Sequence, residues 1–276
     1  MQVRSLEVDF ADVGPHWSEY IDFAQRMNAT STVPSYVEPY LAKVLARARK
    51  QLGGKSPELN RDISVFVQQE MEHCRQHDAF NQMLIRAYPE IVPHLERYGA
   101  DYERFLRTKS LQFNAAYAEG FESMIGLTSP ASWNSMAAFW AKSDPRVAAL
   151  WTWHLAEEHE HREVMFNVYH ALFGKGVRSY LYRIYGFFYA AIHIMGHSRR
   201  VGKLLLEADR RKMGEEAWQR RAKPQLQRGK APLRETLGRL ANLLSPSYNP
   251  ATRQPLPGVE EILVQKIIRA PTANRP

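Results

Sequence analysis

The sequence predicts an all-α protein, a four-helix bundle followed by additional C-terminal helices. Two observations carry this prediction. Long segments repeat apolar residues at the three- and four-residue spacing of an amphipathic helix. No segment alternates apolar and polar residues between turn signals, as a hairpin strand would. The chain has 276 residues, of which 45% are hydrophobic and 24% charged, so it has the composition of a globular protein with a full core.

Glycines, prolines and capping residues separate the four bundle helices that we expect. Gly53-Gly54 stops the first helix, and Ser56-Pro57-Glu58 supplies a cap, an N1 proline and a first-turn acid to the second. Pro89 and Pro130 end the second and third helices, and Ser143-Asp144-Pro145 begins the fourth. The expected ranges are 35–52, 56–87, 101–127 and 145–174.

Further helices and loops are expected to surround this bundle. They comprise short helices at 17–26, 131–141 and 259–268, a long helix at 178–219 with breaks near Gly196 and Gly214, and a Pro/Ser/Asn-rich loop at 244–258. We expect a single domain over residues 1–276. Its core is a bundle at about 30–175, followed by added helices at 176–243 and a wrapping tail at 244–276.

Cysteine content and apolar runs limit where the protein is expected to work. One cysteine, Cys74, excludes an internal disulfide framework and indicates a reducing compartment. The N-terminus lacks the apolar stretch of a signal peptide, and no apolar run approaches the ~18 residues of a spanning helix. We therefore expect a cytoplasmic protein, with peripheral contact at the inner membrane surface as an alternative.

The positive charge is concentrated in one segment. Residues 199–239 carry the whole excess of the +8 net charge. A solvated helical surface is the simpler interpretation, and contact with an anionic membrane is the functional one. The apolar segment Ile184–Gly196 directly precedes it and is expected to be a buried helix, with a shallow membrane contact or the wall of a channel for an apolar substrate as alternatives. No nucleic-acid motif accompanies the charge, so no nucleic-acid partner is expected.

Two segments carry the same short motif. Glu70-Met71-Glu72-His73 and Glu158-His159-Glu160-His161 are both Glu-x-x-His within predicted helices. Positions i and i+3 share a helix face, so each motif directs a carboxylate and an imidazole the same way. In both helices that face is the apolar stripe, which points to the core. Ionisable groups there are costly unless they are paired or bound to metal.

Two inward Glu-x-x-His motifs, with one Glu from each of two other helices, are typical of ferritin-like di-metal bundles, which we predict here. For the third helix we choose Glu119, on a stripe of small residues that leaves room beside a metal, and keep Glu122 as a neighbouring group. For the first helix the one acid is Glu38, although Ser35-x-x-Glu38 also fits a capping box. The predicted metal ligands are Glu38, Glu70, His73, Glu119, Glu158 and His161.

Four more side chains lie near the predicted ligands. His77 and His154 are one turn away on the same stripes, and either an extra ligand or a hydrogen-bonded partner of a ligand fits them. Glu157 lies at the edge of its stripe and is a further candidate. Glu72 and His159 point well off the stripes, so we expect both in solvent.

The motifs resemble those of a known bacterial family, the predicted metal-dependent hydrolases. FVQQEMEHCRQHDAFN at 66–81 and WHLAEEHEHREVMFNVY at 153–169 are similar to its two signatures. Glu119-Gly120-Phe121 resembles its third-helix element, and Glu38 falls where its first-helix Glu stands. The resemblance covers roughly residues 30–200. It implies a ligand pattern similar to that of ferritin-like di-iron proteins.

Histidine and carboxylate ligands suit iron, and also manganese or zinc. We predict two metal ions, with iron preferred, in an O₂-dependent di-iron oxidoreductase that acts on a small or apolar organic substrate. The alternatives are a hydrolase in which the metals activate a water, and a ferritin-like metal or redox protein without an organic substrate. Zinc-protease motifs, the standard phosphate loop and the nucleophile elbow are absent, so no catalytic residue is assigned. A homodimer is compatible with the sequence.

Overall fold

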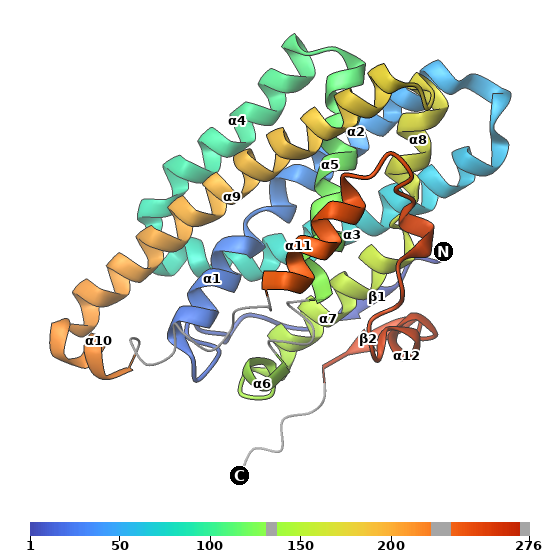
Figure 1. The fold of residues 1–276 in the computed structure, drawn as a ribbon. Coiled ribbons are helices and arrows are strands. Elements are labelled where there is room, and N and C mark those ends of the chain that lie inside the picture. Colours follow the sequence, from blue (N-terminus) through green and yellow to red (C-terminus); the bar gives the residue numbers. More distant parts are fainter. Residues whose placement is uncertain (131–136, 222–232, 271–276) are drawn as a thin grey trace.

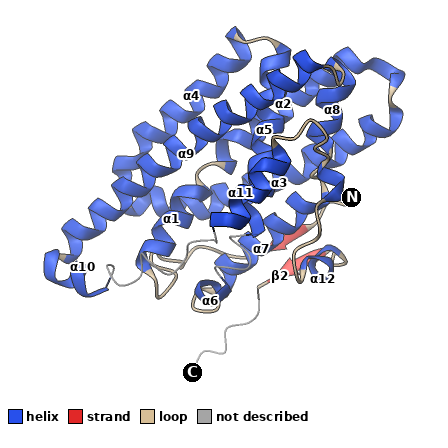
Figure 2. Ribbon diagram, in the orientation of Figure 1, coloured by secondary structure: helices blue, strands red, loops and turns tan. Residues whose placement is uncertain are grey.

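The protein is helical, as a computed structural model shows for residues 1–130, 137–221 and 233–270 (Figure 1). Two three-residue strands are the exception among these residues (Figure 2). The elements are β1 (Ser5–Glu7), α1 (Ile21–Ser31), α2 (Pro34–Leu52), α3 (Pro57–Ala87), α4 (Val92–Thr108), α5 (Leu111–Pro130), α6 (Ala137–Trp140), α7 (Pro145–Glu160), α8 (Val164–Phe173), α9 (Val177–Met213), α10 (Glu215–Arg221), α11 (Leu233–Leu243), α12 (Val259–Leu263) and β2 (Ile267–Arg269). The predicted all-α class is confirmed, and its ferritin-like character stays a prediction.

The third and fourth predicted helices are each interrupted. Extended backbone at Lys109 separates α4 from α5, and the Ser110 hydroxyl caps α5 by accepting a hydrogen bond from the Phe113 amide at 3.1 Å. Between α7 and α8, the Arg162 side chain donates to the His159 carbonyl at 2.5 Å. A side chain that takes a carbonyl from the helical ladder in this way interrupts the helix.

Other predicted bounds hold or shift by a few residues. α2 and α3 lie nearly where the sequence places them. α9 ends at Gly214, whose positive φ of 79° suits glycine, and runs through Gly196 unbroken. Residues 131–136 of the predicted helix at 131–141 lie outside the described residues. The structure describes the remainder, which forms α6.

The two ends of the described chain pair with each other. β1 and β2 run parallel, with Ser5 opposite Ile267 and Glu7 opposite Arg269. The predicted helix at 259–268 is therefore α12 followed by β2. Strands of three residues are too short to give an alternating pattern in the sequence, so this pairing could not be foreseen.

The longest helix, α9, crosses α5 at very close range. A Cβ at Gly186 would lie 2.4 Å from the carbonyl oxygen of Ala116, and one at Gly120 would lie 2.6 Å from Cα of Phe187. The two backbones therefore touch where both helices carry glycine. α9 runs along the length of the molecule across the bundle (Figure 1), so this crossing fixes α5 against it.

The apolar segment Ile184–Gly196 is half buried rather than fully buried. Phe187, Ala190 and Ile194 face the core, whereas Ile192 on the opposite side of α9 is 71% exposed. None of the described helices combines the length and apolar character needed to cross a bilayer. Part of the basic segment 199–239 lies outside the described residues. Membrane contact and a homodimer stay predictions.

Replacing Gly186 by alanine should destabilise the protein, because the added methyl group would displace the α5 backbone. Overpacking of this kind costs about 1–3 kcal/mol, which should lower the melting temperature by several degrees. Gly196→Ala is the matched control on the same helix, since a Cβ there meets nothing within 4 Å. Alanine should leave stability unchanged or raise it by about 0.5–1 kcal/mol. Equal melting temperatures for the two variants would contradict the close crossing.

Candidate metal centre

Seven buried side chains from four helices meet in the bundle core. They form two groups with one member in common, and within each group the ligand atoms lie within 4.8 Å of one another. The first group is Glu38, His73, His154 and Glu158, and the second is Glu70, Glu122, Glu158 and His161. α2, α3, α5 and α7 supply them, with His161 at the C-cap of α7.

Glu158 joins the two groups. Its Oε1 lies 2.8 Å from His154 Nε2, and its Oε2 lies 3.1 Å from His161 Nε2, so each oxygen faces a different group. Burial opposes ionisation of this carboxyl, but His161 and His154 outweigh it and hold the pKa of Glu158 well below its usual range. Glu158 is thus an anion in position to bridge two cations.

The other carboxylates of the cluster lack hydrogen bonds. Both oxygens of Glu38, Glu70 and Glu122 are buried without a hydrogen-bond partner among the described residues. Burial, reinforced by neighbouring carboxylates, raises the pKa of Glu38 and Glu122 well above the usual value. Orphaned buried oxygens are costly. Two divalent cations would give them ligands and would balance the charge of the four carboxylates, so the residues fit a two-metal centre.

Groups outside the cluster orient two of its histidines. His73 Nε2 lies 3.0 Å from Glu157 Oε2, and Arg4 holds the other oxygen of Glu157 at 3.0 Å. Burial alone would lower the pKa of His73, but Glu157 and Glu70 raise it to about 10. His161 Nδ1 lies 3.2 Å from Gln69 Oε1. Such contacts turn the remaining ring nitrogen toward a metal.

The structure gives distinct positions to the two extra histidines. His154 belongs to the first group, whereas both ring nitrogens of His77 are already engaged. His77 Nε2 lies 2.8 Å from His154 Nδ1, and His77 Nδ1 lies 2.8 Å from the Ser31 hydroxyl. His77 is therefore placed to support His154, and Glu157 to support His73.

The choice of Glu119 over Glu122 is corrected by the structure. Glu119 accepts a hydrogen bond from Ser123 at 2.8 Å and pairs with buried Arg183 of α9 at 3.4 Å. Glu122 takes its place in the cluster. The stripe of small residues on α5 is where α9 and Arg253 pack, as the contacts at Gly120 and Gly126 show.

Glu38 is free of the capping role that competed for it. α2 begins with Val33 as its N-cap, so Ser35 lies inside the helix and its hydroxyl accepts a hydrogen bond from Asn81. Glu72 pairs with Arg75 outside the cluster, in keeping with the predicted helix phase. His159, also expected in solvent, is half-buried in the wall of a pocket.

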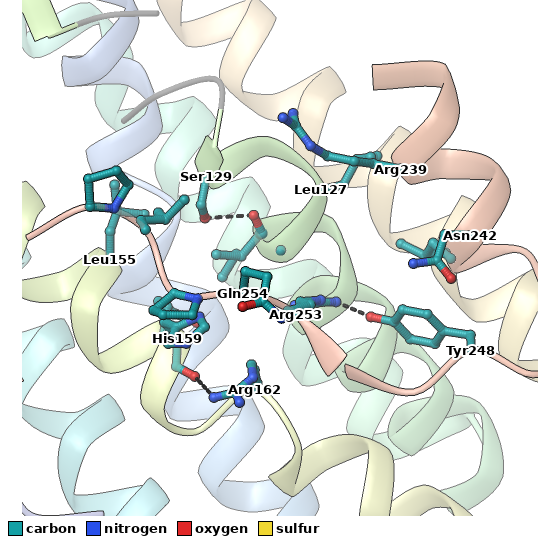
Figure 3. Close-up of a pocket in the computed structure, with 17 residues that line it drawn as sticks. Leu127, Ser129, Leu155, His159, Arg162, Arg239, Asn242, Tyr248, Arg253 and Gln254 are labelled. Carbon is teal, nitrogen blue, oxygen red and sulfur yellow. Dashed lines mark hydrogen bonds between the residues drawn. The ribbon is translucent and has the colours of Figure 1, made fainter. Parts of the chain in front are cut away.

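That pocket, of about 350 Å³, opens beside the cluster (Figure 3). α5, α7, α11 and the segment 248–257 enclose it, and Glu158 forms part of its wall. Of the seven side chains in the cluster, Glu158 is the one that lines it. The pocket is therefore a route from the surface to the shared carboxylate.

Fold and site together define a helical protein with a buried carboxylate–histidine centre that could hold two metal ions. The sequence matches the family described as predicted metal-dependent hydrolase over residues 2–254, and the chain belongs to that family. The resemblance seen in its motifs is thus confirmed. No curated protein and no solved structure matches the chain.

This membership corrects the prediction of activity. An O₂-dependent di-iron oxidoreductase was preferred because four carboxylates and inward histidines are typical of ferritin-like oxidases. The family instead indicates a metal-dependent hydrolase, which was the alternative. The ligand pattern alone could not decide, because the same side chains serve metals that bind O₂ and metals that activate water.

Glutamine substitutions should separate the ligands from their neighbours. Glu158→Gln should lose most of both ions, and Glu122→Gln should lose about one, because each removes a charged ligand oxygen. Glu119→Gln and Glu72→Gln should keep the wild-type content. Metal per chain, measured by mass spectrometry after equilibration with Zn²⁺ or Mn²⁺, checks this. A greater loss from Glu119→Gln than from Glu122→Gln would exclude the geometry described above.

Metal uptake should weaken as the pH falls. The pKa values of Glu38, Glu122 and His73 are raised. Protons therefore compete with the metal for these groups at pH values higher than those at which a carboxyl or an imidazole ordinarily titrates. Affinity, measured by competition with a chelator, should fall as the pH is lowered from about 10, the pKa of His73, and continue to fall as Glu38 and Glu122 are protonated. The drop should be shallower in Glu122→Gln, which has one fewer titrating ligand. A pH-independent affinity would show that these groups are not ligands.

Proposed function

We propose that the protein is a di-metal hydrolase that acts on a small organic substrate bound in the pocket beside Glu158. One observation carries the proposal: the carboxylate shared by the two candidate metal sites also lines the pocket. A substrate in this pocket would lie next to both ions. Family membership supports hydrolysis as the reaction class.

Glu38, His73 and His154 would hold one ion, Glu70, Glu122 and His161 the other, and Glu158 would contact both. When bound, two divalent ions would polarise the bond to be cleaved and supply a nucleophilic water at neutral pH. The ligand set suits Zn²⁺ or Mn²⁺ for this chemistry, with Fe²⁺ as a third candidate.

The surrounding side chains keep the site in one geometry. Arg4 holds Glu157, which holds His73, and Gln69 holds His161, so neither imidazole needs to reorient when substrate arrives. Preorganised groups of this kind lower the cost of reaching the transition state.

A line of hydrogen bonds leads away from the shared carboxylate. His154 Nε2 contacts Glu158, its Nδ1 shares a hydrogen bond with His77 Nε2, and His77 Nδ1 contacts the Ser31 hydroxyl. Burial and the neighbouring His73 lower the pKa of His154 to about 4, and burial and His154 hold the pKa of His77 well below its ordinary value, so both rings are neutral near pH 7. His77 would then be a positioning residue that keeps His154 in one tautomer.

Hydrolysis should proceed without oxygen. Protein loaded with Zn²⁺ or Mn²⁺ should cleave members of a panel of small esters, amides and phosphate esters under anaerobic conditions, and air should not change the rate. Removal of the metal should abolish turnover and lower the melting temperature, because the buried carboxylates lose their counter-charge.

Two variants sharpen this test. Glu158→Gln should be inactive, since the shared ligand is lost, whereas Glu72→Gln should retain activity because Glu72 pairs with Arg75 away from the cluster. Turnover by the metal-free protein, or full activity of Glu158→Gln, would overturn the proposal.

A further inference from the structure

Three arginines line the pocket, Arg162, Arg239 and Arg253, and they come from different parts of the chain (Figure 3). Arg162 lies in the interruption between α7 and α8, directly after His161. Its guanidinium donates to the carbonyl oxygens of His159 at 2.5 Å and Pro250 at 3.1 Å. These neutral acceptors fix the side chain. Among the described residues its ion pair is with Glu163, which is 3.9 Å away and 41% exposed, so its charge is weakly compensated.

Arg253 reaches the pocket from the segment 248–257, to which Arg162 is hydrogen-bonded through Pro250. Its guanidinium occupies the space that a side chain at position 126 would take. It donates a hydrogen bond to the Tyr248 hydroxyl and lies 5.5 Å from the centre of that ring. Among the described residues it forms no ion pair. Arg253 is thus a positioned cation held by neutral groups.

The two guanidinium groups are close enough to affect each other. Arg162 donates to the carbonyl oxygens of Pro250 and Ala251, which lie shortly before Arg253 in the chain, and both guanidinium groups line one pocket. Two cations held in one pocket by carbonyl and hydroxyl oxygens repel each other. The arrangement is favourable when an anion lies between them, and guanidinium groups pair with oxyanions through parallel hydrogen bonds.

The rest of the lining is largely apolar. Ile125, Leu127, Leu155 and Leu256 contribute aliphatic surface. A volume of about 350 Å³ suits a small molecule. The apolar walls offer contact for a hydrocarbon body, while Glu158 marks the place of the reacting bond.

We propose that the substrate carries an oxyanion, a carboxylate or a phosphate, on an apolar body, and that Arg162 and Arg253 bind this oxyanion while the bond to be cleaved lies at Glu158. The inference rests on the proposed function for the position of that bond. It narrows the earlier expectation of a small or apolar substrate to an amphiphilic anion.

The binding of simple probes tests, independently of catalysis, whether the pocket binds an oxyanion. Octanoate, octyl phosphate and the neutral octanol share one apolar body and are compared by isothermal titration calorimetry on metal-loaded and metal-free protein. Both anions, or one of them, should bind at least about tenfold more tightly than octanol, as expected for charge-assisted hydrogen bonds. The preference for carboxylate or for phosphate identifies the oxyanion.

Arginine variants show whether the two guanidinium groups cause that preference. Arg162→Gln and Arg253→Gln should each weaken anion binding about tenfold or more and leave octanol binding unchanged. Arg253→Lys keeps the charge and should lose less. Arg107→Gln, exposed on α4, which does not line the pocket, is the control. Metal content and melting temperature must match the wild type for each variant compared.

Hydrolysis of paired esters separates this inference from the proposed function. The hemisuccinate and the butyrate of one alcohol differ in the terminal carboxylate, and the glutamine variants should raise KM for the hemisuccinate alone. Arginine-dependent anion binding without hydrolysis would refute the hydrolase and support the oxyanion site. Equal binding of octanoate, octyl phosphate and octanol, or anion binding indifferent to both arginines, would overturn the oxyanion site, whatever the esters show.

Discussion

The structure depends on one electrostatic constraint, the gathering of four carboxylates in a core that is largely closed to water. Glu38, Glu70, Glu122 and Glu158 are each no more than 5% exposed. Like charges so close in a medium of low polarity repel strongly. The histidines relieve part of this repulsion. The repulsion that remains, together with six carboxylate oxygens that have no hydrogen bond, is the reason why the cluster suits divalent cations.

The same constraint organises the groups around the cluster. Arg4 balances Glu157 and Arg183 balances Glu119, so the acids that do not face the centre have their own buried cations. Charges are thus sorted into two layers. The inner layer is the cluster, which has an excess of carboxylates that a metal could bind. In the outer layer each acid, Glu157 or Glu119, is paired with an arginine. On the pocket side the positive charges of Arg162 and Arg253 lie farther from the acids, with Glu163 at 3.9 Å from Arg162 and the charge of Arg253 felt by Glu119 and Glu122.

Much of the centre could be predicted because its geometry is local. The spacing of Glu70 and His73, or of Glu158 and His161, fixes their shared helix face without any tertiary information. Glu119 and Glu122 could not be separated in that way, since both lie on the inner side of α5. The two are distinguished by the packing of α9, which brings Arg183 to Glu119 and covers the small residues of α5.

Other features had no signal in the sequence. Arg4 and Arg253 act on residues far away along the chain. The interruption after α7 contains neither proline nor glycine, and it follows from a side-chain contact of Arg162. The helical bounds of α2 and α3 were predicted closely because capping residues, prolines and glycines mark them.

The pairing of β1 with β2 has a consequence for synthesis of the protein. Arg4 lies directly before β1. Its side chain is held by the carbonyl of Leu263 as well as by Glu157. A growing chain therefore cannot complete the support of His73 until residue 263 has left the ribosome. Contacts across such long separations form late in folding. A polypeptide that stopped before residue 263 would keep all seven side chains of the cluster but lose the carbonyl that holds Arg4.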